Sequence, residues 1–141
     1  MNITVISVGK IKEKYFTAAI DEYSKRLSRF AKLNIIEVAD EKIPDNASEK
    51  EMEQIKEKEG NKILAKLPQN SFVVTLCIEG KEHSSEELAK KIADISMTSS
   101  HITFIIGGSL GLSDTVKSKS ALRLSFGKMT LPHQLIRVVL L

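Results

Sequence analysis

Three glycines after an apolar run are the first residues in this sequence that could do chemistry. Gly107, Gly108 and Gly111 follow residues 102–106 and precede Ser113, a residue type suited to start a short helix. Glycine allows a positive φ angle and a close approach of the backbone, both of which a turn against a bound ligand requires. A tight turn without a ligand explains the same glycines nearly as well, so the residues alone leave both interpretations open.

A second loop, residues 127–132, lies between a weak apolar run and a segment that Pro132 can open as the first residue of a helix. His133 and Arg137 follow four residues apart, which places both side chains on one face of that helix. Such a pair could orient or remove a proton and bind a phosphate or a base. Helix capping or a plain surface role is the alternative for both residues.

Leu76 and Cys77 lie in the apolar run 72–78, whose carboxyl end is a third candidate for the same site. A core position is the default interpretation of Leu76. Cys77 is the only cysteine, and we expect a buried apolar side chain rather than a nucleophile or a metal ligand. A chain without disulfides is typical of a reducing compartment. No spacing of ligand-type residues indicates a metal site, and none is expected.

Short runs of β-branched and apolar residues predict the strands that must position these loops. The runs cover residues 3–8, 33–38, 72–78 and 102–106, with a weaker one at 121–126. Their nearly continuous hydrophobicity indicates strands that are covered on both faces.

Amphipathic segments alternate with these runs. Residues 14–30 carry apolar residues at every third or fourth position, and capping-box sequences at Ser48 and Ser84 predict the starts of two further helices. Gly60, inside the second helix, is expected to cost about 1 kcal/mol relative to alanine. The predicted core positions are Phe16, Ile20, Tyr23, Leu27 and Phe30 in the first helix, Met52, Ile55, Leu64 and Leu67 in the second, and Leu88, Ile92 and Ile95 in the third.

This alternation predicts one α/β domain, residues 1–141, with three layers and a mostly parallel sheet. Ligands of such sheets bind at the carboxyl ends of the strands. The turn at 107–111, the loop at 127–132 and Leu76 all lie at such ends, so we expect them to surround one pocket. The glycine spacing differs from the dinucleotide-binding fingerprint, which follows the first strand, because here only Gly9 follows that strand.

The net charge of +3 is unevenly distributed. Residues 1–32 carry seven Lys and Arg against three acidic residues, residues 33–60 carry four against nine, and residues 115–141 carry five against none. If the fold brings the basic ends together, they form a face that attracts nucleic-acid phosphates; solvated helix surface is the simpler alternative. No signal peptide or membrane span is predicted, so by elimination we expect a cytoplasmic protein without a membrane partner.

Two long motifs indicate a family that these patterns fit. Residues 104–112 read FIIGGSLGL and residues 124–134 read LSFGKMTLPHQ. Together and in this order, they resemble the large-subunit ribosomal RNA pseudouridine N3-methyltransferases of the SPOUT superfamily. Residues 8–15 (VGKIKEKY) and the DEK segment that begins at Asp40 resemble the same family, so the likeness covers essentially the whole chain.

The resemblance implies a C-terminal trefoil knot, a homodimer, and S-adenosylmethionine held in the knot as methyl donor. It also implies that the substrate is N3 of a pseudouridine in large-subunit (23S) ribosomal RNA, with the ribosome or its large subunit as partner. A knot is not something that sequence physics predicts. Carried over by position, the donor site consists of Leu76, Gly108, Gly127, Lys128, Met129, Thr130, Leu131 and Pro132, to which we add Gly107 from the glycine turn.

Methyl transfer from a sulfonium is an in-line displacement that depends mainly on proximity and orientation. The target nitrogen must also lose a proton, and we expect His133 and Arg137 to be the catalytic candidates. Two other functions stay open: a nucleotide- or NAD-dependent α/β enzyme that uses the turn at 107–111 for phosphate, and a non-catalytic RNA- or ribosome-binding module. The family pattern continues past Leu141 with more helix and a basic tail containing tyrosine and histidine, and we expect this tail to be absent here.

Overall fold

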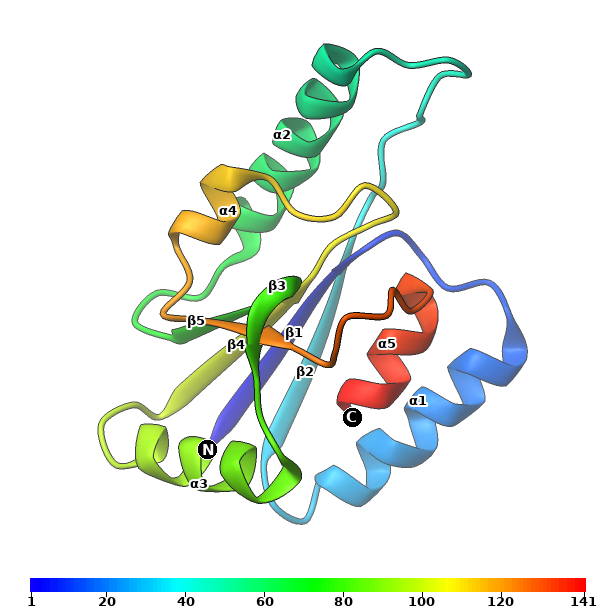
Figure 1. Ribbon diagram of the computed structural model, residues 1–141. Helices are drawn as coiled ribbons and strands as arrows, with labels where there is room; N and C mark the ends of the chain where they lie inside the picture. Colours follow the sequence, from blue (N-terminus) through cyan, green and yellow to red (C-terminus); the bar gives the residue numbers. More distant parts are fainter.

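Five parallel strands form the sheet in the computed structural model, which describes residues 1–141 (Figure 1). The order across the sheet is β2-β1-β4-β3-β5. The strands are β1 (Asn2–Val8), β2 (Lys32–Val38), β3 (Phe72–Glu82), β4 (His101–Ile106) and β5 (Leu122–Ser125). The helices are α1 (Lys14–Leu27), α2 (Glu49–Lys66), α3 (Ser85–Ser96), α4 (Asp114–Ser118) and α5 (His133–Leu140). Strands and helices alternate along the chain, so the predicted α/β class and the parallel sheet are confirmed.

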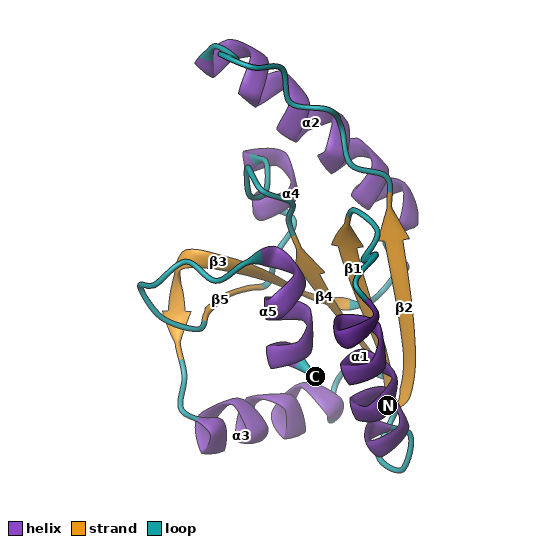
Figure 2. Cartoon of the chain, turned by 90° about the vertical axis from the view of Figure 1, so that its right-hand side faces the viewer, coloured by secondary structure: helices purple, strands orange, loops and turns teal.

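Helices cover both faces of the sheet and bury a hydrophobic core on each. α2 and α4 lie on one face, whereas α1, α3 and α5 lie on the other (Figures 1 and 2). Side chains alternate along β1, so Ile6 belongs to the core under α2 and α4, and Val5 to the core under α3 and α5. Each fully buried Val or Ile side chain stabilises such a fold by about 1.5–3 kcal/mol. The three layers predicted from the continuous apolar runs are present.

Strand β3 extends from the predicted end at Ile78 to Glu82. Its pairing register with β5 shifts between Leu76 and Lys81. Gly80 lies in the shifted part, where an added Cβ would be 2.7 Å from the carbonyl oxygen of Arg123 on β5. The two backbones therefore approach closely at this bulge, a feature that a hydrophobicity pattern does not signal.

Two helix boundaries differ from the prediction. α1 ends at Leu27, and Phe30, predicted on its apolar face, lies beyond the helix and is 79% exposed. α5 starts at His133, so Pro132 is the cap residue rather than the first helical residue. The predicted capping box of α2 is confirmed, because Ser48 Oγ accepts a hydrogen bond from the backbone N–H of Glu51 at 3.1 Å and the Glu51 carboxylate accepts one from Ser48 N–H.

Candidate active site

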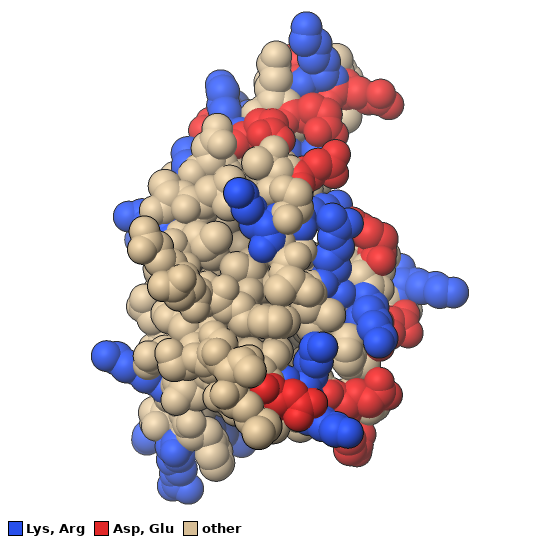
Figure 3. Space-filling view, turned by 90° about the vertical axis from the view of Figure 1, so that its left-hand side faces the viewer, with Lys and Arg blue, Asp and Glu red and all other residues tan.

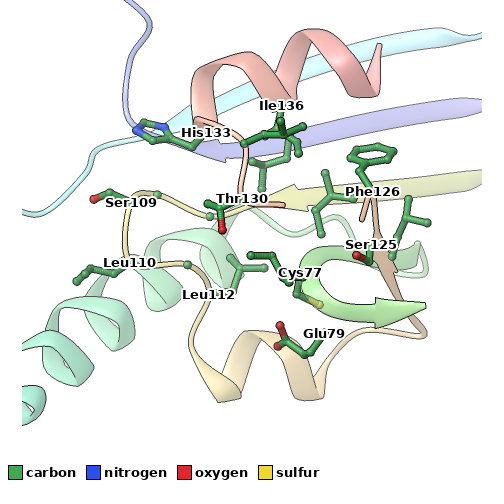
Figure 4. A pocket seen from close by; sticks show the side chains of 18 of the residues that line it. Cys77, Glu79, Ser109, Leu110, Leu112, Ser125, Phe126, Thr130, His133 and Ile136 are labelled. Atoms are coloured by element: carbon green, nitrogen blue, oxygen red, sulfur yellow. The ribbon is translucent and has the colours of Figure 1, made fainter. Parts of the chain in front are cut away.

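The carboxyl ends of β3, β4 and β5 surround a pocket of about 720 Å³ (Figure 4). This volume lies within the range of small-molecule sites, roughly 300–1,000 Å³. The wall combines apolar side chains with glycine backbone and a few polar groups. It is lined by Lys56, Leu76, Cys77, Ile78, Glu79, Ile106, Gly107, Gly108, Ser109, Leu110, Gly111, Leu112, Lys117, Leu124, Ser125, Phe126, Gly127, Met129, Thr130, Leu131, Pro132, His133 and Ile136.

The turn at 107–111 forms one part of this wall. Gly111 N–H donates a hydrogen bond to the carbonyl oxygen of Gly108 at 3.0 Å, and Gly111 has a φ angle of +83°. A Cβ at Gly107 would lie 2.7 Å from the carbonyl carbon of Gly111. Position 107 therefore has no room for a side chain, whereas at position 111 the positive φ angle favours glycine. The turn is tight and faces the pocket, so the two interpretations of these glycines are compatible.

The loop that follows β5 forms another part of the wall. Ser125 Oγ donates a hydrogen bond to the carbonyl oxygen of Gly127 and accepts one from Gly127 N–H, both at 3.1 Å. Gly127 has a φ angle of +132°, which favours glycine. The loop then enters α5, whose cap residue Pro132 forms no side-chain hydrogen bond. The first backbone N–H groups of α5 thus have no side-chain cap, and such groups bind anions readily.

Most of the residues predicted from the sequence lie around this one pocket, with His133 at its edge below α5 (Figure 4). Two of them do not line it: Lys128 is exposed, and Arg137 is buried elsewhere. The predicted residues that do line it are Leu76, Gly107, Gly108, Gly127, Met129, Thr130, Leu131, Pro132 and His133.

Arg137 is only 4% exposed, and its guanidinium binds groups within the protein. Nη2 donates hydrogen bonds to the carbonyl oxygens of Val8 at 2.6 Å and Gly9 at 3.0 Å. Nη1 forms an ion pair with Glu37 Oε2 at 3.0 Å. A charge removed from water needs such partners, and they occupy most of its donors. These contacts favour a structural role over the contact with phosphate or base suggested by the sequence.

His133 is half-buried in the first turn of α5. Burial lowers the pKa of its imidazole, and the positive charge of Arg137 lowers it further, whereas Asp40 and Glu13 act in the opposite direction. Its Nδ1 atom is buried and has no hydrogen-bond partner. The imidazole is therefore neutral near pH 7 and able to accept a proton.

The extension of β3 beyond Ile78 forms one side of the pocket, and no sequence pattern predicted it. Glu79 pairs there with Lys117 of α4, with 2.5 Å between Oε1 and Nζ. The hydrogen bond from Lys117 lowers the pKa of Glu79. Because the extension of β3 was not predicted, no signal in the sequence placed these two residues together.

Cys77 also lines the pocket, half-buried rather than buried as expected. Burial and the charge of Glu79 raise the pKa of its thiol. A thiol with a raised pKa is a poor nucleophile at neutral pH, and no nucleophilic role was expected for Cys77. Phe126 and Ile136 are further lining residues that were not singled out. Phe126 lay inside the second motif, which is the one signal that could have identified it.

The charge pattern bears on nucleic-acid binding. Figure 3 shows a broad uncharged area bordered by Lys and Arg, with many acidic side chains along one margin and near the top. α1 and α5 pack side by side, so parts of both basic ends do meet. The C-terminal end contributes fewer free charges than its composition suggested, because Lys117 is paired with Glu79 and Arg137 is buried.

None of the helices combines the length and hydrophobicity that a bilayer crossing requires. No group of three or more His, Cys, Asp or Glu side chains is arranged to hold a metal ion.

Known proteins resemble the chain over its whole length. A family model described as "Predicted SPOUT methyltransferase" matches residues 1–141. Ribosomal RNA large subunit methyltransferase H from Clostridium botulinum (strain Kyoto / Type A2) is 63% identical over 142 aligned positions, which cover 100% of the chain and 89% of the relative. The chain belongs to the SPOUT methyltransferase family. The protein of the same name from Clostridium novyi (strain NT) is 60% identical with the same coverage.

Membership of the SPOUT family determines the class of reaction. SPOUT methyltransferases take the methyl group from S-adenosylmethionine, so the chain is a methyltransferase that uses this donor. The resemblance drawn from the two motifs is confirmed. A nucleotide- or NAD-dependent enzyme, which the glycine turn also allowed, receives no support from these matches.

Proposed function

We propose that residues 1–141 form a single SPOUT domain that methylates N3 of a pseudouridine in large-subunit ribosomal RNA. The observation that carries this proposal is the convergence of the turn at 107–111 and the loop at 127–132 on one pocket of about 720 Å³. The relatives that match the whole chain are named as large-subunit ribosomal RNA methyltransferases. The substrate class follows from those names, and the choice of N3 follows from the motif resemblance.

The pocket fits S-adenosylmethionine as donor. Apolar side chains, among them Leu76, Leu131 and Ile136, suit the adenosyl part. The uncapped N–H groups at the start of α5 suit the donor's carboxylate. Backbone groups of the glycine turn and of the loop supply the remaining contacts. A backbone contact at Lys128 is compatible with its exposed side chain.

When bound, S-adenosylmethionine supplies a methyl carbon activated by the neighbouring sulfonium. The chain holds the methyl carbon and the acceptor nitrogen in line, and this lowers the entropic part of the activation barrier. The proton on the acceptor nitrogen must leave as the new bond forms. We assign its acceptance to the neutral imidazole of His133, which then carries the positive charge.

The proposal includes a trefoil knot formed by the C-terminal segment. Three observations support it: residues 127–132 pass beside the turn at 107–111, both line one pocket, and α4 and α5 lie on opposite faces of the sheet (Figure 2). Pulling the chain by its ends in an optical trap should leave a compact remnant. A fully unfolded length matching all 141 residues would contradict the knot.

The proposal also includes a homodimer that covers α1 and α5. α1 has no buried side chain, and Tyr15 on it is 69% exposed. Val139 on the neighbouring α5 is 49% exposed, so both helices present apolar surface to solvent. Light scattering during gel filtration should give twice the mass of one chain. Val139→Asp should shift the protein toward the monomer, and a monomeric wild type would contradict this part.

Calorimetric titration tests donor binding directly. We expect S-adenosylmethionine and its demethylated product to bind with one site per chain, and NAD and ATP not to bind. Binding of NAD or ATP alone would favour the nucleotide-dependent alternative. RNA binding without any donor affinity would favour the non-catalytic module.

Methylation is tested with large subunits or whole ribosomes from a strain that lacks the modification. Transfer of labelled methyl to large-subunit RNA, followed by nuclease digestion and mass spectrometry, identifies the modified nucleoside. A methyl group on N3 blocks the pairing edge of the base, so it should also stop reverse transcription at one position. Label at another atom or in another RNA would contradict the assigned substrate.

A further inference from the structure

A buried arginine fastens the last helix to a place where three other chain segments meet. The Arg137 guanidinium binds the last carbonyl of β1, at Val8, and the next one, at Gly9. It also binds Glu37 Oε2, an atom that accepts a second hydrogen bond, from Ile11 N–H at 3.2 Å. One side chain of α5 thereby links β1, β2 and the segment that leads into α1.

Helix α5 depends on such contacts for its position. It has eight residues and no side-chain cap, and isolated helices of this length are unstable in water. Ile136 and Leu140 pack on the core under α3, which fixes one face of the helix. Arg137 is the one charged residue of α5 and supplies its polar attachment to the strand ends.

We propose that Arg137 is a positioning residue, which pins α5 to the ends of β1 and β2 and thereby sets where His133 lies at the pocket. His133 is one helical turn before Arg137, so a shift of the guanidinium moves the imidazole with it. The loop 127–132 ends where α5 begins, so the same attachment also fixes the part of the pocket wall that this loop forms. The proposal rests on the proposed function only for its effect on catalysis, because the place of His133 can be measured without a donor.

The alternative is direct contact between Arg137 and the RNA substrate. Three of its donor contacts are already made within the protein, and its Nε atom is buried without a partner. Arg137 does not line the pocket. A substrate group could reach the guanidinium only if α5 moved away from β1.

The charge of Arg137 gives the positioning role a measurable signature. It lowers the pKa of His133 in addition to the effect of burial, whereas the carboxylates of Asp40 and Glu13 raise it. Removal of this charge alone should therefore raise the pKa of His133. Replacement by lysine keeps a positive charge, so a raised pKa in Arg137→Lys reports that His133 has moved and lost burial.

Two variants separate charge from geometry. Arg137→Met keeps the length of the side chain and removes the charge, and Arg137→Lys keeps the charge but not the planar fork that reaches several acceptors. The midpoint of the His133 Cε1 resonance is followed by NMR against pH in the donor-free protein, with His133→Gln for assignment. Donor affinity is measured by calorimetry. Lys119→Met, an exposed position outside the pocket, is the matched control for loss of one positive charge.

We expect Arg137→Met to raise the His133 midpoint and weaken donor binding. Arg137→Lys should also raise the midpoint, because an imidazole that moves with α5 loses part of its burial. It should weaken donor binding by about tenfold, because the attachment of α5 loses its geometry. Wild-type donor affinity in Arg137→Lys would overturn the proposal, and this variant decides the matter if Arg137→Met does not fold. Lost RNA methylation with unchanged donor affinity and an unchanged His133 midpoint would assign Arg137 to substrate contact instead. If the wild type binds no donor, the proposed function fails, whereas the midpoints still test the positioning of His133.

Discussion

Gly60 of α2 and Ser113, the cap residue of α4, lie so close together that a Cβ on Gly60 would be 2.6 Å from Ser113 Oγ. The same Cβ would be 3.0 Å from a methyl group of Val116, which is fully buried. Ser113 cannot easily move aside, because its Oγ caps α4 by accepting a hydrogen bond from Val116 N–H at 3.3 Å. Glycine in the middle of α2 thus serves close packing of two helices, and its low helix propensity is the accompanying cost.

Gly60→Ala should therefore destabilise the protein, contrary to what helix propensity predicts. Alanine gains about 1 kcal/mol as a helix former, but overpacking in a tight interface costs about 1–3 kcal/mol. We expect a net loss in the free energy of unfolding, measured by urea titration followed by circular dichroism. Ala65→Gly at an exposed position of α2 calibrates the propensity term. A more stable Gly60→Ala would show that the interface can relax.

Much of the fold could be predicted because strands buried on both faces have a simple signature. The apolar runs at 3–8, 33–38 and 102–106 end at the observed strand ends, Val8, Val38 and Ile106. The meeting of the loops at 107–111 and 127–132 was also predictable, since parallel strands bring their carboxyl ends to one edge of the sheet. The strand order was not predictable, because apolar runs on central strands look alike wherever they pair.

The environments of single side chains could not be predicted. The spacing of Arg137, four residues from His133 on the same helical face, predicts that it binds a phosphate or a base. It is instead held inside by the carbonyl oxygens of Val8 and Gly9, which are 129 and 128 residues away in sequence. Gly60 was counted as a weak point for the same reason, because its neighbour Ser113 is distant in sequence. Contacts of this range depend on tertiary packing and leave no local pattern.

Gly107→Ala should weaken donor binding strongly, whereas Gly111→Asn should not. At 107 an added Cβ would meet the backbone of Gly111, so the turn must open and the pocket wall with it. At 111 there is free space, and Asn tolerates positive φ, so the cost is only conformational strain. Calorimetry with S-adenosylmethionine should show at least about a tenfold weaker affinity for Gly107→Ala. Wild-type affinity in Gly107→Ala would exclude a role of the turn in donor binding.

Glu59→Gln should stabilise the protein at neutral pH. Glu59 is a buried carboxylate whose Oε2 accepts a hydrogen bond from Glu41 N–H at 2.9 Å, and burial raises its pKa. A raised carboxyl pKa in the folded state means that ionisation favours unfolding, so stability falls as pH rises above the ordinary value of 4.5. A glutamine oxygen keeps the hydrogen bond and carries no charge.

The stabilisation by Glu59→Gln should therefore be present at pH 7 and vanish below about pH 4, where both states of the wild type are protonated. Thermal unfolding at a series of pH values measures this difference. Glu53→Gln, an exposed position of the same helix, is the control and should show no such gain. A gain that persists at low pH would point to packing rather than to the buried charge.

Cys77 should react slowly with iodoacetamide, and the donor should slow it further. Burial raises the pKa of the thiol, so the thiolate fraction at pH 7.5 is below that of a free cysteine. Cys77 lines the candidate donor pocket, so bound S-adenosylmethionine should shield it. Because the chain has one cysteine, mass spectrometry of the intact protein gives the rate directly, with urea-unfolded protein as reference. No protection at saturating donor would separate Cys77 from the donor site.

His133→Gln should spare donor binding and reduce methyl transfer by about 10²–10⁴-fold, the usual contribution of a general base. Because the pKa of His133 is lowered, the wild-type rate should be flat near pH 7 and fall only as pH drops below 6.5, the ordinary value. The same shift makes stability fall with acidification in that range, since the unfolded chain binds the proton more readily. Single-turnover rates against pH for both proteins test the assignment: glutamine cannot take a proton, so the acid limb should disappear in the variant. A variant that keeps the wild-type limb would assign the proton to another group, whatever the loss in rate.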